Sequence, residues 1–283
     1  MRKSTKFWLI AAALLIVLGF AMFTAVMMGP NWDFTRLSTA KYQTNTYQLK
    51  EAFHNISIQT DTADIVFATS DDGVAKVVCY EMENAKHSVT IQDGTLSILL
   101  EDRREWYEQI GIFVDSPQVT VYIPQGVQFA SIKVKASTGG IYTEDVSTDS
   151  LELSVSTGHI RVSNITCENT VTIHVSTGET HIADLKCKNF TSTGDTGDIT
   201  LRNVIASEKL SIERSTGDIE FADCDAAEIF IKTDTGDVEG TLLTGKVFVV
   251  ETDTGSIEVP PNTTGGKCQI STDTGDIQID ISR

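Results

Sequence analysis

The chain has 283 residues, with 39 acidic and 22 basic side chains and a formal net charge of −17 at pH 7. So acidic a surface repels nucleic acid and anionic lipid, which argues against a nucleic-acid-binding function. It suits a solvated exterior and attracts basic peptides or divalent cations.

The first 28 residues differ in composition from the rest of the chain. Three basic residues precede an uncharged run from Phe7 to Met28. As a helix this run is about 33 Å long, enough to cross the roughly 30 Å hydrocarbon core of a bilayer. The basic flank predicts a cytoplasmic N-terminus, and the lack of a small-x-small cleavage site favours an uncleaved anchor over a signal peptide. We therefore expect residues 1–28 to be a cytoplasmic flank and transmembrane signal-anchor, and residues 29–50 to be a polar stalk.

Residues 51–283 are expected to form an extracellular β-repeat domain. Its first part, Phe53 to Gln128, contains short alternating apolar runs that predict an irregular β cap. Within it, Glu101 to Pro117 interrupts an acidic, aromatic-poor chain with two arginines and three aromatic residues. This segment is either a short amphipathic loop that closes the cap or a recognition surface, whose side chains are Arg103, Arg104, Trp106, Tyr107 and Phe113.

The second half of the chain is a repeat. Eight Thr-Gly pairs recur at regular spacing, and their successive glycines are 19 or 20 residues apart. Apolar positions alternate before each glycine and change parity after it, so each pair is interpreted as a corner where glycine adopts dihedrals that side chains resist. A period this short predicts an all-β fold, a parallel β-solenoid of about eight coils, because each coil buries its apolar face only by stacking on its neighbours. The expected corners are Thr138, Gly139, Thr157, Gly158, Thr177, Gly178, Thr196, Gly197, Thr216, Gly217, Thr235, Gly236, Thr254, Gly255, Thr274 and Gly275.

The alternative to the solenoid is an antiparallel meander of hairpins, because Thr-Gly can also close a tight turn. In the solenoid, Asn or Asp recurs six residues after the glycine and is expected to turn the chain back into the core, at Asp145, Asn164, Asp184, Asn203 and Asp223.

Carboxylates flank the corners and are the main candidates for chemistry. Asp234, Asp253 and Asp273 each stand two residues before a corner glycine. Stacked carboxylates that share calcium or magnesium are one interpretation, and capping of nearby backbone N–H groups is the favoured one. His159, His174 and His181 lie in neighbouring coils but lack the short spacing of metal ligands. We predict no cofactor, no metal and no catalytic residue, because catalysis usually breaks a repeat and this one is regular.

The five cysteines fall into two groups. Cys79, Cys224 and Cys268 occupy apolar positions and are predicted to be small buried hydrophobes. Cys167 and Cys187 both stand nine residues after a corner glycine in adjacent coils, so stacking brings them within reach of a disulfide, with free thiols as the alternative.

Several phrases together resemble a known family. They are I-x-I-x-T-x-x-A-D-I at 56–65, D-G-x-L-x-I from Asp93, V-x-V-x-I-P ending at Pro124, and the tandem T-G-D-I coils. Over residues 50–283 the chain resembles the bacterial putative-adhesin family, a β-strand repeat domain of unknown function. The aspartate after glycine is replaced at Gly140, His159, Glu179 and Ser256. Some membrane-anchored members are similar to accessory proteins of cell-envelope stress operons, which implies a Gram-positive surface protein without catalytic activity.

These observations predict a single-pass protein of the cell membrane whose extracellular β-solenoid presents a binding or scaffolding surface in the cell envelope, in adhesion or envelope stress. The membrane is contacted through the N-terminal helix. An envelope protein, a wall polymer or a basic peptide are the candidate partners. A polysaccharide-acting solenoid enzyme and a cation-stabilised structural spacer are the alternatives.

Overall fold

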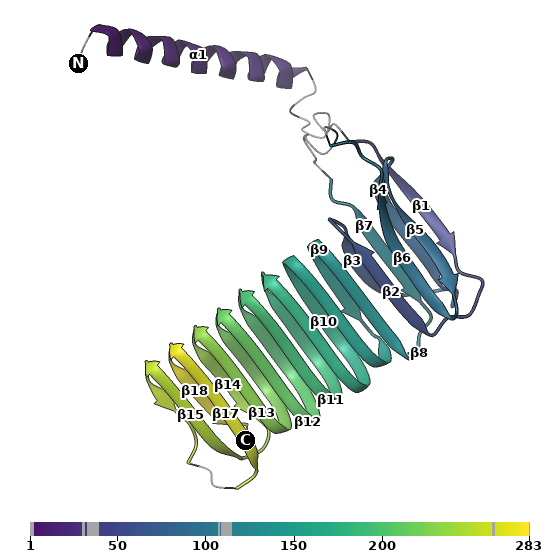
Figure 1. Cartoon of the computed structure of the whole chain (residues 1–283), viewed down its shortest axis with the longest axis vertical. Coiled ribbons are helices and arrows are strands. Elements are labelled where there is room, and N and C mark those ends of the chain that lie inside the picture. The colour runs from purple at the N-terminus through teal and green to yellow at the C-terminus, as the bar shows by residue number, and fades with distance from the viewer. Residues whose placement is uncertain are drawn as a thin grey trace. The chain divides into compact units, whose positions relative to one another are not determined.

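The computed structural model describes residues 3–29, 32, 40–106, 108, 115–261 and 264–282 (Figure 1). They fall into two compact units: residues 1–41 with 104–116, and residues 42–103 with 117–283. Over these described residues the fold is all-β apart from one N-terminal apolar helix.

The first unit contains the helix α1 (Lys3–Met28). Its apolar part, Lys6–Met28, has a mean hydropathy of 2.7 over its most apolar stretch, which is not buried against other described residues. A helix of these 23 residues is long and apolar enough to cross a membrane, as a membrane anchor or a signal sequence does.

The second unit is one continuous hydrogen-bonded sheet that folds back on itself. Its first strands are β1 (Tyr42–Gln48), β2 (Asn55–Thr60), β3 (Asp64–Thr69), β4 (Lys76–Met82), β5 (Ala85–Gln92), β6 (Thr95–Asp102), β7 (Gln118–Ile123) and β8 (Gln128–Phe129). The repeat contains β9 (Ser131–Glu144), β10 (Ser147–Thr177), β11 (Thr180–Thr196), β12 (Ile199–Thr216), β13 (Ile219–Thr235), β14 (Val238–Leu242), β15 (Lys246–Thr254), β16 (Ile257–Glu258), β17 (Gly266–Thr274) and β18 (Ile277–Ile281).

The strands before the repeat form the expected irregular cap. β2 and β3 pair in parallel with the two halves of β9. The residues at the junction of β2 and β3, Asp61 to Asp64, therefore form a first corner. There the Gly140 N–H donates to Asp64 Oδ1 over 2.7 Å. Beyond β2 lie β6 and then β5, and beyond β3 lie β7, β4 and β1. Because β4, β5 and β1 run antiparallel to their neighbours, the parallel pattern ends in the cap.

β1 corrects the expected stalk over residues 29–50. Residues 42–48 of that stretch pair with β4 along the whole strand, so they belong to the cap. The polar and apolar side chains of β1 alternate between half-buried and exposed positions. This is the pattern of an edge strand with one face on a core.

The repeat is a stack of parallel coils. Thr157 pairs with Thr138, Thr216 with Thr235, and the strands on either side of each corner pair in the same direction. The parallel register confirms the solenoid-like stack and shows the antiparallel meander to be wrong. The corner glycines have φ between +124° and +153°. A Cβ on Gly178 would lie 1.7 Å from the carbonyl oxygen of Gly158, so both the dihedral and the close approach require glycine.

The coils are not stacked in sequence order. β13 and β14 pair with β17 and β18, and these in turn pair with β15 and β16. The last coil of the chain, around Gly275, therefore lies between the coils of Gly236 and Gly255, and Figure 1 shows β17 and β18 inside β15. The Gly255 coil ends in Pro260 and Pro261. Since proline has no N–H to donate to a ladder, this coil suits the end of the stack.

The turn residues behave as expected. The five Asp and Asn residues six positions after the glycines have φ between +51° and +56°, the left-handed region that these two residue types tolerate. Asp and Asn alternate along the stack, so an Asn amide can donate to the Asp of the preceding coil. Asn164 donates to Asp145, and Asn203 donates to Asp184 over 2.7 Å.

All five cysteines are free and buried, so Cys167 and Cys187 are not bonded to each other. Burial raises the pKa of the Cys187 thiol to about 12 and that of Cys224 to about 11. These thiols are therefore protonated and unreactive at neutral pH.

Candidate functional site

The aspartates that follow the corner glycines form a hydrogen-bonded ladder. The Asp218 N–H donates to Asp198 Oδ1 over 2.9 Å, and the Asp237 N–H donates to Asp218 Oδ1 over 2.9 Å. The ladder continues from Asp276 to Asp237 over 2.7 Å and from Ser256 to Asp276 over 2.7 Å. Each carboxylate thus caps a backbone N–H of the next coil. The T-G-D phrase is explained by this structural role.

The aspartates two residues before the glycines form a separate column. The register places Asp273 between Asp234 and Asp253, because β17 lies between β13 and β15. Lys232 Nζ lies 3.4 Å from Asp234 Oδ1. Within the described ranges these three carboxylates do not form one of the clusters whose ligand atoms converge closely enough to hold a metal. Absence of calcium binding here stays a prediction.

The expected recognition segment is only partly described. Arg103 belongs to the β unit, where its side chain is 79% exposed and donates to Glu101 Oε2 over 2.7 Å. Arg104 and Trp106 belong to the other unit, and Trp106 is 73% exposed. Tyr107 and Phe113 lie outside the described residues. The recognition role of this segment is therefore still a proposal.

A basic groove lies on the solvent-facing side of the strands that follow the corners. Arg161, His181 and Arg202 line it together with Ser163 and Ala183, and its volume is about 340 Å³. Arg161 pairs with His181 and Ala183 pairs with Arg202 in adjacent coils, so the charges lie along one surface. The small side chains between them form the floor. In a chain of net charge −17 this groove is a local concentration of positive charge.

An acidic groove continues the same face toward the C-terminal coils. Glu220, Glu239 and Asp280 line it together with Arg202, which also lines the basic groove, and its volume is about 280 Å³. Glu220 pairs with Glu239 in the adjacent coil. The outer face therefore changes from arginine-rich to carboxylate-rich along the stack, over buried columns that are mainly apolar.

Of the three predicted histidines only His181 lines the basic groove, and the three do not share a site. Tyr142 Oη and His159 Nε2 are 2.5 Å apart, and His181 Nε2 lies 3.1 Å from Glu179 Oε2. The hydrogen bond from His181 lowers the pKa of Glu179. His174 instead contacts hydroxyl oxygens, Thr193 Oγ1 at 3.0 Å and Ser176 Oγ at 3.1 Å.

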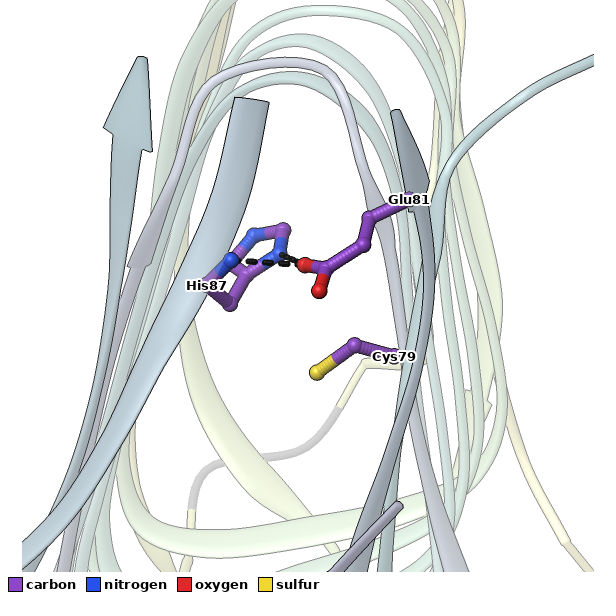
Figure 2. Close-up of side chains that lie close together, drawn as sticks. All are labelled: Cys79, Glu81 and His87. Atoms are coloured by element: carbon purple, nitrogen blue, oxygen red, sulfur yellow. Dashed lines mark hydrogen bonds and ion pairs between the residues drawn. The ribbon is translucent and has the colours of Figure 1, made fainter. Parts of the chain in front are cut away.

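A buried polar cluster lies inside the cap (Figure 2). Glu81 on β4 and His87 on β5 flank the two-residue turn between these strands, and Cys79 lies on the same face of β4 as Glu81. Glu81 is 0% exposed, Cys79 0% and His87 2%. Their ligand atoms, a sulfur, a carboxylate oxygen and a ring nitrogen, all lie within 4.8 Å of one another.

Hydrogen bonds hold the two polar members of this cluster. Glu81 Oε2 accepts from the backbone N–H of His87 over 2.6 Å and lies 2.8 Å from His87 Nδ1. Glu81 Oε1 accepts from the Asn45 amide over 2.6 Å, and His87 Nε2 lies 2.9 Å from Thr60 Oγ1. Burial raises the pKa of Glu81, but the hydrogen bonds from His87 and Asn45 outweigh it, so the net shift is downward. Burial, assisted by the charge of Glu81, raises the pKa of Cys79 to about 12.

A cavity adjoins the cluster. It has a volume of about 320 Å³ and is lined by Tyr47, Glu83, Lys86, His87 and Arg103, among others. His87 thus belongs both to the buried cluster and to the wall of a space that contains charged side chains. The Tyr47 hydroxyl donates to the carbonyl oxygen of His87 over 3.2 Å, which fixes the strand at this wall.

Sequence reasoning missed Glu81 and His87. The available signal was the alternation in K-V-V-C-Y-E-M, which places a carboxylate on the same face as the buried Val77 and Cys79. It also missed Arg214, which is 4% exposed and lies at a core position. Its guanidinium donates to Thr180 Oγ1 and Ser192 Oγ over 3.2 and 3.0 Å, and burial lowers its pKa to about 10. Gly194 makes room for it, since a Cβ there would lie 2.7 Å from Arg214 Nη1.

Comparison with known proteins identifies the fold family. No curated protein matches the sequence. The structure is similar to a putative adhesin from Bacteroides fragilis, with 16% identity and a TM-score of 0.51, over 86% of this chain and 97% of that one. It is also similar to a putative lipid binding protein from Parabacteroides distasonis, with 12% identity and a TM-score of 0.46, over 87% and 98% of the two chains. The Toastrack DUF4097 family matches residues 53–175 and 168–283. The chain therefore belongs to the Toastrack DUF4097 family.

Proposed function

We propose that this protein is a membrane-anchored module whose repeat domain, outside the cell, presents a binding surface in the cell envelope, in adhesion or in the response to envelope stress. The observation that carries the proposal is the outer face of the stack, where a basic and an acidic groove adjoin each other over a mainly apolar core. A stack needs only solvation on this face, so two adjoining grooves, one with two arginines and one with three carboxylates, are more than the fold requires.

The helix α1 supports the location. Its 23-residue apolar part is long enough to span a bilayer, and the three basic residues near its start favour a cytoplasmic N-terminus. The β unit would then lie outside the cell. An exterior of strongly negative charge is consistent with a soluble domain that stays clear of the anionic lipid surface.

The chemistry of the basic groove favours an anionic partner. Two guanidinium groups, at Arg161 and Arg202, flank a floor of small side chains. Guanidinium recognises phosphate and carboxylate by paired hydrogen bonds. The partner that fits best is an anionic polymer of the cell wall. A basic peptide on the acidic groove is the second candidate, supported by Glu220, Glu239 and Asp280.

A cosedimentation experiment tests this function. The full chain in detergent is mixed with cell-wall sacculi that retain or lack their anionic polymers. We expect binding to the first only, weaker at high salt, and reduced by Arg161→Gln with Arg202→Gln. The matched control is Lys186→Gln with Lys209→Gln, which removes two exposed charges away from the groove and should leave binding unchanged.

Equal binding by both double variants would contradict the groove assignment. Failure to bind either preparation would favour the structural spacer, and release of polymer fragments would favour the enzyme.

A further inference from the structure

We propose that Cys79, Glu81 and His87 form a binding site for a zinc-type divalent metal ion inside the cap. The three side chains supply a sulfur, an oxygen and a nitrogen ligand from two adjacent strands, with all ligand atoms within 4.8 Å of one another (Figure 2). Zinc binds thiolate at about 2.3 Å and imidazole or carboxylate at about 2.0–2.2 Å. Ligand atoms of a tetrahedral zinc site are therefore about 3.3–3.6 Å apart, a spacing that small side-chain rotations reach from this cluster.

The charges of the cluster favour a divalent cation. Glu81 is fully buried, and its two carboxylate oxygens accept hydrogen bonds from the His87 backbone N–H and the Asn45 amide, which favour the ionised form inside the cap. Zinc displaces the proton of the Cys79 thiol to solvent and forms a Zn–S bond. The ion, one thiolate and one carboxylate then sum to zero charge, which suits a buried site.

The surroundings of His87 fit metal binding as well. Its Nδ1 faces Glu81 at 2.8 Å, and its Nε2 lies 2.9 Å from Thr60 Oγ1. When Nδ1 binds the metal, the ring hydrogen resides on Nε2 and is donated to the Thr60 hydroxyl. A ligand histidine usually donates its other N–H to such a partner, which fixes the tautomer and the ring orientation. Thr60 is therefore a positioning residue.

The adjoining cavity gives the ion an access route. His87 lines this space of about 320 Å³, whose wall carries the carboxylates of Glu83 and Glu101 as well as the cationic groups of Lys86 and Arg103. Three protein ligands leave the fourth position of a tetrahedral zinc ion for water. The site is separate from the grooves of the repeat and does not depend on the proposed envelope function.

Cobalt titration tests the site, because Co²⁺ replaces Zn²⁺ in tetrahedral sites and shows a charge-transfer absorption when a thiolate binds it. The full chain is purified in detergent without a histidine tag, stripped of metal and titrated with Co²⁺. We expect one Co²⁺ per chain, a thiolate charge-transfer band, release of protons, and displacement by Zn²⁺. Cys79→Ser should lose the band. Thr60→Val should weaken Co²⁺ binding by about tenfold or more.

Cys268→Ser is the matched control, because Cys268 is also 0% exposed and burial raises its pKa to about 12. This variant should keep the full band. No thiolate band in the wild-type chain, a band that survives in Cys79→Ser, or a band lost in Cys268→Ser would each overturn the proposal. The wild-type spectrum decides the first outcome even where a variant folds poorly, and circular dichroism verifies the fold of each variant.

Discussion

Replacing Gly217 with alanine tests the corner geometry. The φ of Gly217 is +142°, a region that costs a side chain on the order of 1–3 kcal/mol. A Cβ would also lie 2.3 Å from the carbonyl oxygen of Gly197, so the two coils must separate by about 1 Å to restore normal contact. That separation weakens two hydrogen bonds of 2.9 Å, from Gly197 N–H to the Thr216 carbonyl and from Asp218 N–H to Asp198. At about 1 kcal/mol each, the total loss should be about 3–5 kcal/mol.

The free energy of unfolding of the full chain in detergent, from urea denaturation, measures this loss. Ser215→Ala is the matched control, because Ser215 is exposed and only two residues from the same glycine. We expect the control to stay within about 0.5 kcal/mol of the wild type. If Gly217→Ala were as stable as Ser215→Ala, the close approach of the coils at this corner would be refuted.

Three further experiments probe charges along the stack. Arg214→Met should leave the free energy of unfolding within about 1 kcal/mol of the wild type, because removing a buried charge offsets the loss of its hydrogen bonds. A loss of stability above about 3 kcal/mol would show that the guanidinium is a net stabiliser. The hydrogen bonds from the Ser256 backbone N–H and hydroxyl lower the pKa of Asp276 below its ordinary value of 3.8. The Asp276 carboxylate therefore stabilises the fold fully above about pH 3.8, and this stabilisation is lost as the pH falls through the lowered pKa. Asp276→Ala should therefore flatten the acid side of the stability profile more than the control Asp280→Ala, and identical profiles would contradict the ladder. Asp234→Asn, Asp253→Asn and Asp273→Asn combined should not lower the melting temperature, with or without calcium, and a calcium-dependent rise confined to the wild type would restore the metal interpretation.

The repeat was predictable from sequence because its columns are local. The Thr-Gly pairs, the parity change and the Asp or Asn turns each depend on a single coil, and the structure places them as expected. The order of the last two coils was not predictable in this way. Every coil offers the same Thr, Gly and Ile columns to its neighbours, so the register alone does not say which coils meet. Pro260 and Pro261 were the one local signal for an end position.

The cap was harder to predict for a different reason. Its contacts join strands distant in sequence, as when Asn45 on β1 donates to Glu81 on β4. No periodic column marks such a pair. Cys79 was correctly predicted to be buried, but its neighbours Glu81 and His87 became visible only through the β4–β5 turn that brings them together. The outer grooves likewise depend on which coils are adjacent.

Thiol labelling of intact cells tests most directly whether the β unit lies outside a membrane anchor. The five native cysteines are at most 8% exposed, so they should not react with a membrane-impermeant maleimide. Ser215→Cys places a single accessible thiol in the repeat, and Ser4→Cys places one at the basic flank of the helix. In wall-stripped cells we expect Ser215→Cys to be labelled without permeabilisation, Ser4→Cys only after it, and both chains to stay in the membrane fraction at full length. Labelling of Ser215→Cys only after permeabilisation, or a shortened soluble chain in the medium, would contradict the anchored exterior domain.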